Sequence, residues 1–227
     1  MRVIMLPVLL TLLVLMSTDW ACAQKNDSIS QVPSSNSQRQ TLRDKWTAYA
    51  VGTFGPRVLF EPIFPATYWM ASPPDHYPRE WRQGAQGFAR NYAAELASQV
   101  AFKTARAGAG ALLHEDLRCH RAVARNPLLR TGHALAYGFV DRSDSGRPRI
   151  ALANFVGVGA AGYSGRLYLP AGFNDVSHAD TRLAIRFGLL EVNHVLAEFA
   201  PEFEHLGEKV HLKYRRLIPE WWTSANK

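Results

Sequence analysis

The longest regular pattern in the chain runs from Glu80 to His114, where alanine recurs at every fourth position between a row of large apolar residues and a row of polar residues. Only a helix produces parallel rows at this spacing, so the pattern predicts one long helix. Small side chains let a second backbone approach closely. Because a four-residue row advances about 40° per step, we expect this helix to be central and to contact at least two others. The alanine row is Ala85, Ala89, Ala93, Ala97, Ala101, Ala105 and Ala109; the large row is Phe88, Tyr92, Leu96 and Val100; the polar row is Asn91, Glu95, Gln99 and Lys103.

A second apolar segment, Ile150 to Gly165, repeats the small-residue spacing. It is short for a membrane span, which takes roughly 20 apolar residues, and the polar residues Asn154 and Ser164 interrupt it. The pattern therefore predicts a buried helix of a soluble bundle, and a strand-rich structure from Ile150 to Leu169 is the main alternative. The small residues are Ala153, Gly157, Ala161 and Gly165.

Shorter segments predict further helices through their caps and breaks. Thr41 is an expected helix cap, with Gly52 and Gly55-Pro56 ending that helix, and Asn126-Pro127 reads as a cap and first position. The sequence indicates no second domain and no repeat longer than the four-residue rows. We therefore predict one all-α, bundle-like domain over residues 41–227. The other expected helices are a kinked or broken one over Arg57–Ser72, one that closes at a turn over Ser143–Gly146, one over Ala179–Phe199 that Pro201 interrupts, and a short basic one over Glu208–Ile218.

The first 23 residues have the layout of a cleaved secretory signal. Arg2 gives a positive start, Val3–Met16 is mostly apolar, and Ala21-Cys22-Ala23 is a small-residue exit. A retained anchor and a lipoprotein acylated at Cys22 are the alternatives. Residues 24–40 are rich in Ser, Gln and Asn and predict a disordered linker. We therefore expect an exported protein of the periplasm or cell envelope.

Composition and charge narrow the classes of partner. The chain is 47% hydrophobic and 20% charged, which is typical of a globular protein. Without Cys22, Cys119 is the one cysteine left, so the exported chain depends on its core rather than on a disulfide. The formal net charge of +7 favours an anionic membrane surface, with another envelope protein as a further possible partner and no nucleic acid. Solubility alone also explains such a charge.

The densest group of reactive side chains lies between His114 and His120. On a helix, Asp116 and His120 are neighbours one turn apart, as are Glu115 and Cys119. Such pairs can chelate a metal, or one partner can tune the other. His114, Glu115, Asp116 and His120 are therefore the candidate metal ligands. A simple helix end, where charges complement the helix dipole, is the alternative, and the spacing matches no known zinc motif.

Two weaker motifs are explained without a cofactor. Glu191-x-x-His194 and Glu202-x-x-His205 resemble half-sites of di-iron bundles. Eleven residues on one continuous helix place the two units about 16 Å apart, so one site cannot use both unless Pro201 folds the chain back. The glycines from Gly157 to Gly162 match a dinucleotide fingerprint, but helix packing explains them better. No cofactor is expected.

The C-terminal segment has the composition of a membrane-surface helix. Its basic residues fall on one helical face, apolar residues fall opposite, and two tryptophans follow, as at membrane interfaces. A last helix packed on the core, with a solvated charged side, is the alternative. The candidate membrane-surface residues are Lys209, Lys213, Arg216, Trp221 and Trp222.

Four short motifs resemble a group of uncharacterised exported proteins of environmental bacteria. They are Pro78–Gly84, Ala111–Arg118, Gly132–Ala134 and Asp144–Gly146, and the similarity covers about 49–203. Cys119 stands where that group has an aromatic residue. The resemblance implies export and a mostly helical fold, and it implies no activity.

From these patterns we expect an exported envelope protein that is non-catalytic and either structural, interacting or associated with a membrane surface. The alternative is a metal-binding protein or a metal-dependent enzyme that uses the cluster from His114 to His120.

Overall fold

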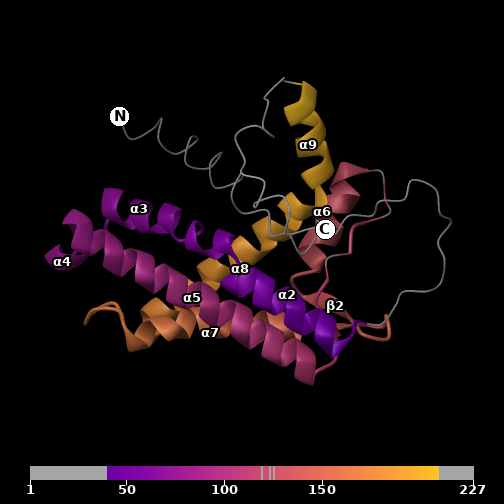
Figure 1. Cartoon of the computed structure of the whole chain (residues 1–227), viewed down its shortest axis with the longest axis horizontal. Helices are drawn as coiled ribbons and strands as arrows, with labels where there is room; N and C mark the ends of the chain where they lie inside the picture. The colour runs from indigo at the N-terminus through magenta and orange to yellow at the C-terminus, as the bar shows by residue number, and fades with distance from the viewer. Residues whose placement is uncertain (1–39, 119, 123, 125, 210–227) are drawn as a thin grey trace. The chain divides into compact units, whose positions relative to one another are not determined.

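The computed structural model (Figure 1) describes residues 40–118, 120–122, 124 and 126–209. This part of the chain is mostly helical, with one small three-stranded sheet, which confirms the predicted helical class. It forms two compact units. Unit 1 contains the described residues of Met1–Lys45, His114–Ala151 and Leu190–Lys227, and unit 2 contains Trp46–Leu113 and Leu152–Leu189. The single domain expected over residues 41–227 stays a prediction.

Unit 2 is built around one long helix. The predicted helix from Glu80 to His114 is observed as α5, and it begins later because Gln83 is extended and Gly84 has a positive φ of 68°. Helices α3 and α2 lie along one side of α5, and α7 lies along another (Figure 1). The predicted break in Arg57–Ser72 is confirmed. The elements are α2 (Leu42–Phe54, from Trp46 onward), η2 (Pro56–Leu59), α3 (Ile63–Ala71), α4 (Arg79–Arg82), α5 (Gly84–Leu112), α7 (Leu152–Ser164), η3 (Gly165–Leu167) and α8 (Val176–Glu198, up to Leu189).

Helix α7 packs through its small residues, as the sequence predicts, and the strand-rich alternative is wrong. A Cβ at Gly157 would lie 2.9 Å from the Cβ of Arg106 in α5, and a Cβ at Gly162 would lie 2.8 Å from the Cα of Leu183 in α8. The motif glycines therefore serve the close approach of helices. All four small residues of the row are buried: Ala153, Gly157, Ala161 and Gly165.

The alanine row of α5 behaves differently from the prediction. Its first four members, up to Ala97, are exposed, and only Ala109 at its far end is buried. The buried positions include Asn91 of the expected polar row, together with Gly87 and Ser98. The reason is the drift of a four-residue row around the helix axis, which carries its seven members from solvent into the core over six steps.

Unit 1 combines short helices with the small sheet. The sheet is antiparallel with the order β1-β2-β3, and Glu115 pairs with Ser143. The predicted cap is confirmed, because Oδ1 of Asn126 accepts a hydrogen bond of 2.9 Å from the Leu128 amide. The expectation of helix up to the turn at Ser143 is wrong after Ala136, because that stretch pairs as a strand. The elements are the start of α2, β1 (Glu115–Asp116), α6 (Pro127–Ala136), β2 (Val140–Ser143), β3 (Pro148–Ile150), the end of α8 from Leu190, and α9 (Ala200–Lys209).

Thr41 caps α2 through reciprocal hydrogen bonds with Asp44, as predicted, although the helix continues past Gly52 to Phe54. Pro201 lies in the first turn of α9, directly after α8 ends. None of the helices in the described residues combines the length and the apolar character needed to cross a bilayer.

Candidate functional site

The described residues of the segment, His114–Arg118 and His120, are not helical. Glu115 and Asp116 form strand β1, and His114 precedes it with a left-handed φ of 56°. Successive side chains of a strand point to opposite faces, so the carboxylates of Glu115 and Asp116 diverge. Glu115 is completely buried, while the side chain of His114 is 77% exposed. The geometry expected from a helix is therefore wrong for this segment.

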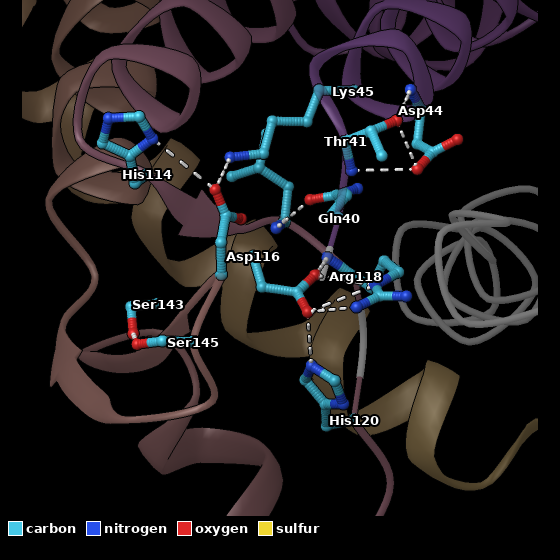
Figure 2. A network of polar contacts seen from close by, with 12 residues as sticks. Gln40, Thr41, Asp44, Lys45, His114, Asp116, Arg118, His120, Ser143 and Ser145 are labelled. Atoms are coloured by element: carbon cyan, nitrogen blue, oxygen red, sulfur yellow. Dashed lines mark hydrogen bonds and ion pairs between the residues drawn. The ribbon is translucent and has the colours of Figure 1, made fainter. Parts of the chain in front are cut away.

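Asp116 is the centre of a polar network in unit 1 (Figure 2). Its Oδ2 accepts a hydrogen bond of 2.6 Å from Nη2 of Arg118, and its Oδ1 accepts one of 2.8 Å from Nε. The Nε2 atom of His120 lies 3.4 Å from Oδ2. Asp116 and His120 thus meet across a loop rather than along a helix.

The electrostatics of Asp116 and Arg118 favour the charged form of each. Burial opposes ionisation of Asp116, but the hydrogen bonds from Arg118 and the contact with His120 outweigh burial and hold the pKa of this carboxyl well below its usual range. The hydrogen bond to Asp116 raises the pKa of Arg118 in turn. Because Arg118 donates two hydrogen bonds to the Asp116 carboxylate, few lone pairs of that carboxylate remain to bind a metal ion.

A second ion pair lies beside the first. Nζ of Lys45, whose side chain is 3% exposed, lies 2.9 Å from Oδ2 of Asp144, and Nδ1 of His114 lies 3.8 Å from the same oxygen. His114, Ser143, Asp144 and Ser145 line a shallow hollow of about 270 Å³. His114 therefore contacts a different carboxylate from His120.

The network fixes the start of α2 to the sheet. Gln40, at the end of the predicted linker, is buried, and its Oε1 accepts a hydrogen bond of 3.1 Å from the Leu117 amide. Figure 2 shows Gln40, Thr41 and Lys45 approaching the β1 segment from one side. The arrangement stabilises three segments of unit 1 that are distant in the sequence.

Of the four predicted metal ligands, Asp116 and His120 lie in direct contact. Within the described residues, no group of three or more His, Cys, Asp or Glu side chains is arranged to hold a metal ion. Cys119 lies outside the described residues. The metal assignment of the cluster stays a prediction.

The structure adds a group that sequence reasoning did not assemble. The ring of Tyr137 lies 5.0 Å from that of His133, 6.0 Å from that of His120 and 6.5 Å from that of His194, between ring centroids. Glu191 lies one turn before His194 on α8 and contacts Gly138. We call Tyr137 and the three imidazoles the tyrosine–histidine cluster.

Two pKa values in this region are strongly displaced. Burial raises the pKa of Tyr137 to about 12 and that of Glu191 to about 7. Displaced titrations gather at functional sites more often than elsewhere. The sequence signal for this group was the motif Glu191-x-x-His194, whose second copy does not take part: Glu202 forms an ion pair with Arg130.

Arg130 joins α6 to the end of α8 and to α9. Its Nε lies 2.9 Å from Oε1 of Glu198, its Nη2 donates to the Glu198 carbonyl oxygen at 2.7 Å, and its guanidinium lies 4.5 Å from the centre of the Phe199 ring. With Glu202, these contacts form the Arg130 clamp of unit 1.

Most of the predicted membrane-surface residues follow the last described residue of the chain. Lys213, Arg216, Trp221 and Trp222 lie outside the described residues, and Lys209 ends α9 as the last described residue.

Comparisons with known proteins give no match, whether with protein-family models, curated proteins or solved structures. The resemblance to exported bacterial proteins stays a prediction.

We expect Asp116→Asn to lower the free energy of unfolding at pH 7 by about 2 kcal/mol, because it removes the charged partner of Arg118. The folded-state pKa of Asp116 is depressed, so its contribution is present above the ordinary value of 3.8 and is lost as the pH falls. Urea unfolding at pH 7 and pH 3 should show a smaller difference at pH 3. Asp75→Asn, at an exposed position, should change little, and equal effects of both variants would contradict a stabilising role for the network.

Proposed function

We propose that the chain is an exported, non-catalytic envelope protein that binds an anionic membrane surface through unit 2. The layout of residues 1–23 supports export. The supporting observation in the fold is the exposure of large apolar side chains along α2, η2, the turn after η2 and the start of α3, which we call the apolar strip. The strip comprises Trp46, Val51, Phe54, Leu59, Phe60 and Ile63.

The large side chains of this strip are highly exposed to solvent. Trp46 is 66% exposed and Phe54 is 72% exposed, and their rings both pack on the ring of Tyr49. Single exposed apolar residues are normal on protein surfaces. Six of them within eighteen consecutive residues (46–63) instead mark an interaction surface.

The same segment contacts α5 through polar groups. Nζ of Lys103 donates to the Gly52 carbonyl oxygen at 2.8 Å and pairs with Glu61 at 3.1 Å. The hydroxyl of Tyr92 donates to the Leu59 carbonyl oxygen at 2.8 Å. Polar groups therefore hold the segment to α5, together with the buried Val58 and Pro62, while the six apolar side chains of the strip remain exposed.

An anionic membrane fits this surface better than a protein partner of matched shape. Tryptophan and other aromatic side chains are enriched where proteins meet the bilayer interface. The positive net charge of +7 adds attraction to anionic headgroups, and a helix that lies in the interface inserts its apolar face beside them.

The double variant Trp46→Ser and Phe54→Ser should weaken binding of the chain from Gln24 to anionic vesicles by at least tenfold. Each buried aromatic side chain contributes about 1.5–3 kcal/mol, and 1.4 kcal/mol corresponds to a factor of ten. Vesicle co-sedimentation measures the change.

Leu167→Ser is the matched control, because Leu167 is 89% exposed in η3 and lies outside the strip. It should pellet like the unmodified chain. Equal pelleting of all three proteins would show that the strip does not bind lipid, and loss of binding only after removal of residues 210–227 would assign binding to the C-terminal segment. Equal binding to neutral and anionic vesicles would show that the positive charge of the protein does not contribute to membrane binding.

A further inference from the structure

We propose that Glu191 is a proton-dependent latch in unit 1, which holds the end of α8 against the turn between α6 and β2 when its carboxyl group is protonated and loosens it when the carboxyl is ionised. This regulation is separate from the apolar strip of unit 2 and does not depend on it.

The contact between Glu191 and Gly138 is the structural basis of the latch. Both carboxyl oxygens of Glu191 are buried, and neither has a hydrogen-bond partner among the described residues. A Cβ atom on Gly138 would overlap Oε1 of Glu191, so the carboxyl group lies directly against the main chain of the turn. Only glycine leaves room for it there.

The groups around Glu191 supply no strong counter-charge to it. His194 lies one turn away on α8, His133 lies on α6, and Tyr137 directly follows α6, with His120 beyond Tyr137. Asp141 and Arg142 of β2 act on Tyr137. The nearby charges are engaged elsewhere: Asp116 with Arg118, and Arg130 with Glu198 and Glu202.

Burial without a hydrogen-bond donor therefore decides the protonation of Glu191. It disfavours the carboxylate and raises the pKa of Glu191 from 4.5 to about 7. The folded chain thus holds this proton more tightly than the unfolded chain. The stability that the neutral carboxyl allows is complete below pH 4.5 and is lost as the pH rises through about 7.

Ionisation should act locally because the Arg130 clamp is independent of it. The ion pair raises the pKa of Arg130 and lowers that of Glu202, so both stay charged across this range and the clamp continues to join α6 to α9. The carboxylate of Glu191, in contrast, must gain water or leave Gly138. Residues 190–198 are therefore expected to open at the Glu191 end and to stay attached at the Glu198 end.

The first test is urea unfolding of the full chain from Gln24 between pH 5 and pH 8, with Glu191→Gln as the variant. The unfolding equilibrium constant of the unmodified chain should rise at least tenfold over this range, below a limit of about 70-fold that the two pKa values set. Glu191→Gln should abolish most of that rise. Glu202→Gln is the matched control and should retain it, because the Arg130 pair lowers the pKa of Glu202 out of this range. Equal pH dependence of the unmodified chain and Glu191→Gln would overturn the proposal.

Gly138→Ala gives a second test with Glu191 still present. The added methyl group displaces the carboxyl toward solvent, so the pH dependence should shrink as it does in Glu191→Gln. Hydrogen exchange, corrected for the intrinsic effect of pH, should show weaker protection of residues 190–198 at pH 8 than at pH 5. Unchanged protection there, or stabilisation by added zinc that is lost in Glu191→Gln, would overturn the latch, and the second result would identify a metal site instead.

Discussion

Gly162→Ala should lower the free energy of unfolding by about 1–3 kcal/mol, although it adds only one methyl group. The new Cβ would lie 2.8 Å from the backbone N and Cα of Leu183 in α8, closer than van der Waals contact allows. A backbone cannot rotate away as a side chain does, so α7 and α8 must move apart along the contact. The loss also spreads to the close-packed neighbours of Gly162.

Gly159→Ala provides a control in the same helix. A Cβ at Gly159 meets nothing within 4 Å, and alanine is a better helix former than glycine by about 0.5–1 kcal/mol. Gly159→Ala is therefore expected to leave the protein as stable or more stable. Urea unfolding of both variants measures the difference. Equal stability of Gly162→Ala and Gly159→Ala would mean that α7 and α8 are not in close contact in solution.

The sequence predicts the packing of the small-residue row in α7 but not that of the alanine row in α5. The row from Ala153 to Gly165 is surrounded by large apolar residues, so the sequence predicts that the row is buried. The structure confirms that prediction. The alanine row of α5 has the same spacing but is exposed up to Ala97. Alanine is compatible with both environments, because it packs closely in a core and is also the best helix former on a surface. Spacing alone cannot distinguish the two.

Strand β1 was missed because its cause is not local. Glu115 and Asp116 have low strand propensity, and they become a strand by pairing with Ser143 and Arg142, almost thirty residues later in the chain. Asp116 and His120 were expected to meet as helical neighbours and instead meet through a loop. The predicted contact is observed for a different structural reason.

The tyrosine–histidine cluster also forms through contacts between segments that are distant in the sequence, so the sequence alone does not predict it. His133 and Tyr137 lie at a spacing of four residues on α6 and its last turn, which the sequence shows. His120 and His194 join them only through the packing of the loop and the end of α8. The spacing of Glu191-x-x-His194 is visible in the sequence, whereas the burial of Glu191 against Gly138 depends on a turn between α6 and β2, where the sequence predicts a helix.

Unit 2 has a polar side chain at the point where a core residue would normally be apolar. Asn91 of α5 is 2% exposed. Its Oδ1 accepts a hydrogen bond of 2.8 Å from the Tyr77 hydroxyl, and its Nδ2 donates to the carbonyl oxygens of Trp81 at 2.6 Å and Gly87 at 2.9 Å. Asn91 therefore holds the segment before α4, α4 itself and the start of α5 together, with each of its polar atoms satisfied.

Asn91→Asp should lower the free energy of unfolding by about 3 kcal/mol or more at pH 7, although the two side chains have the same shape. The variant replaces a donor with an acceptor, so a buried carboxylate faces two carbonyl oxygens that have lost their partner. Burial should raise the pKa of the introduced carboxyl, and protonation restores one donor, so part of the loss should be recovered as the pH falls toward 4.

Asn126→Asp makes the same chemical change at the exposed cap of α6 and serves as its control. Aspartate caps a helix as well as asparagine does, and its charge suits the helix N-terminus, so this variant should stay within about 0.5 kcal/mol of the unmodified protein. Thermal or urea unfolding at pH 7 and pH 4 measures both variants. If Asn91→Asp is no more harmful than Asn126→Asp, or if its deficit grows on acidification, Asn91 does not donate to Trp81 and Gly87 in a buried site.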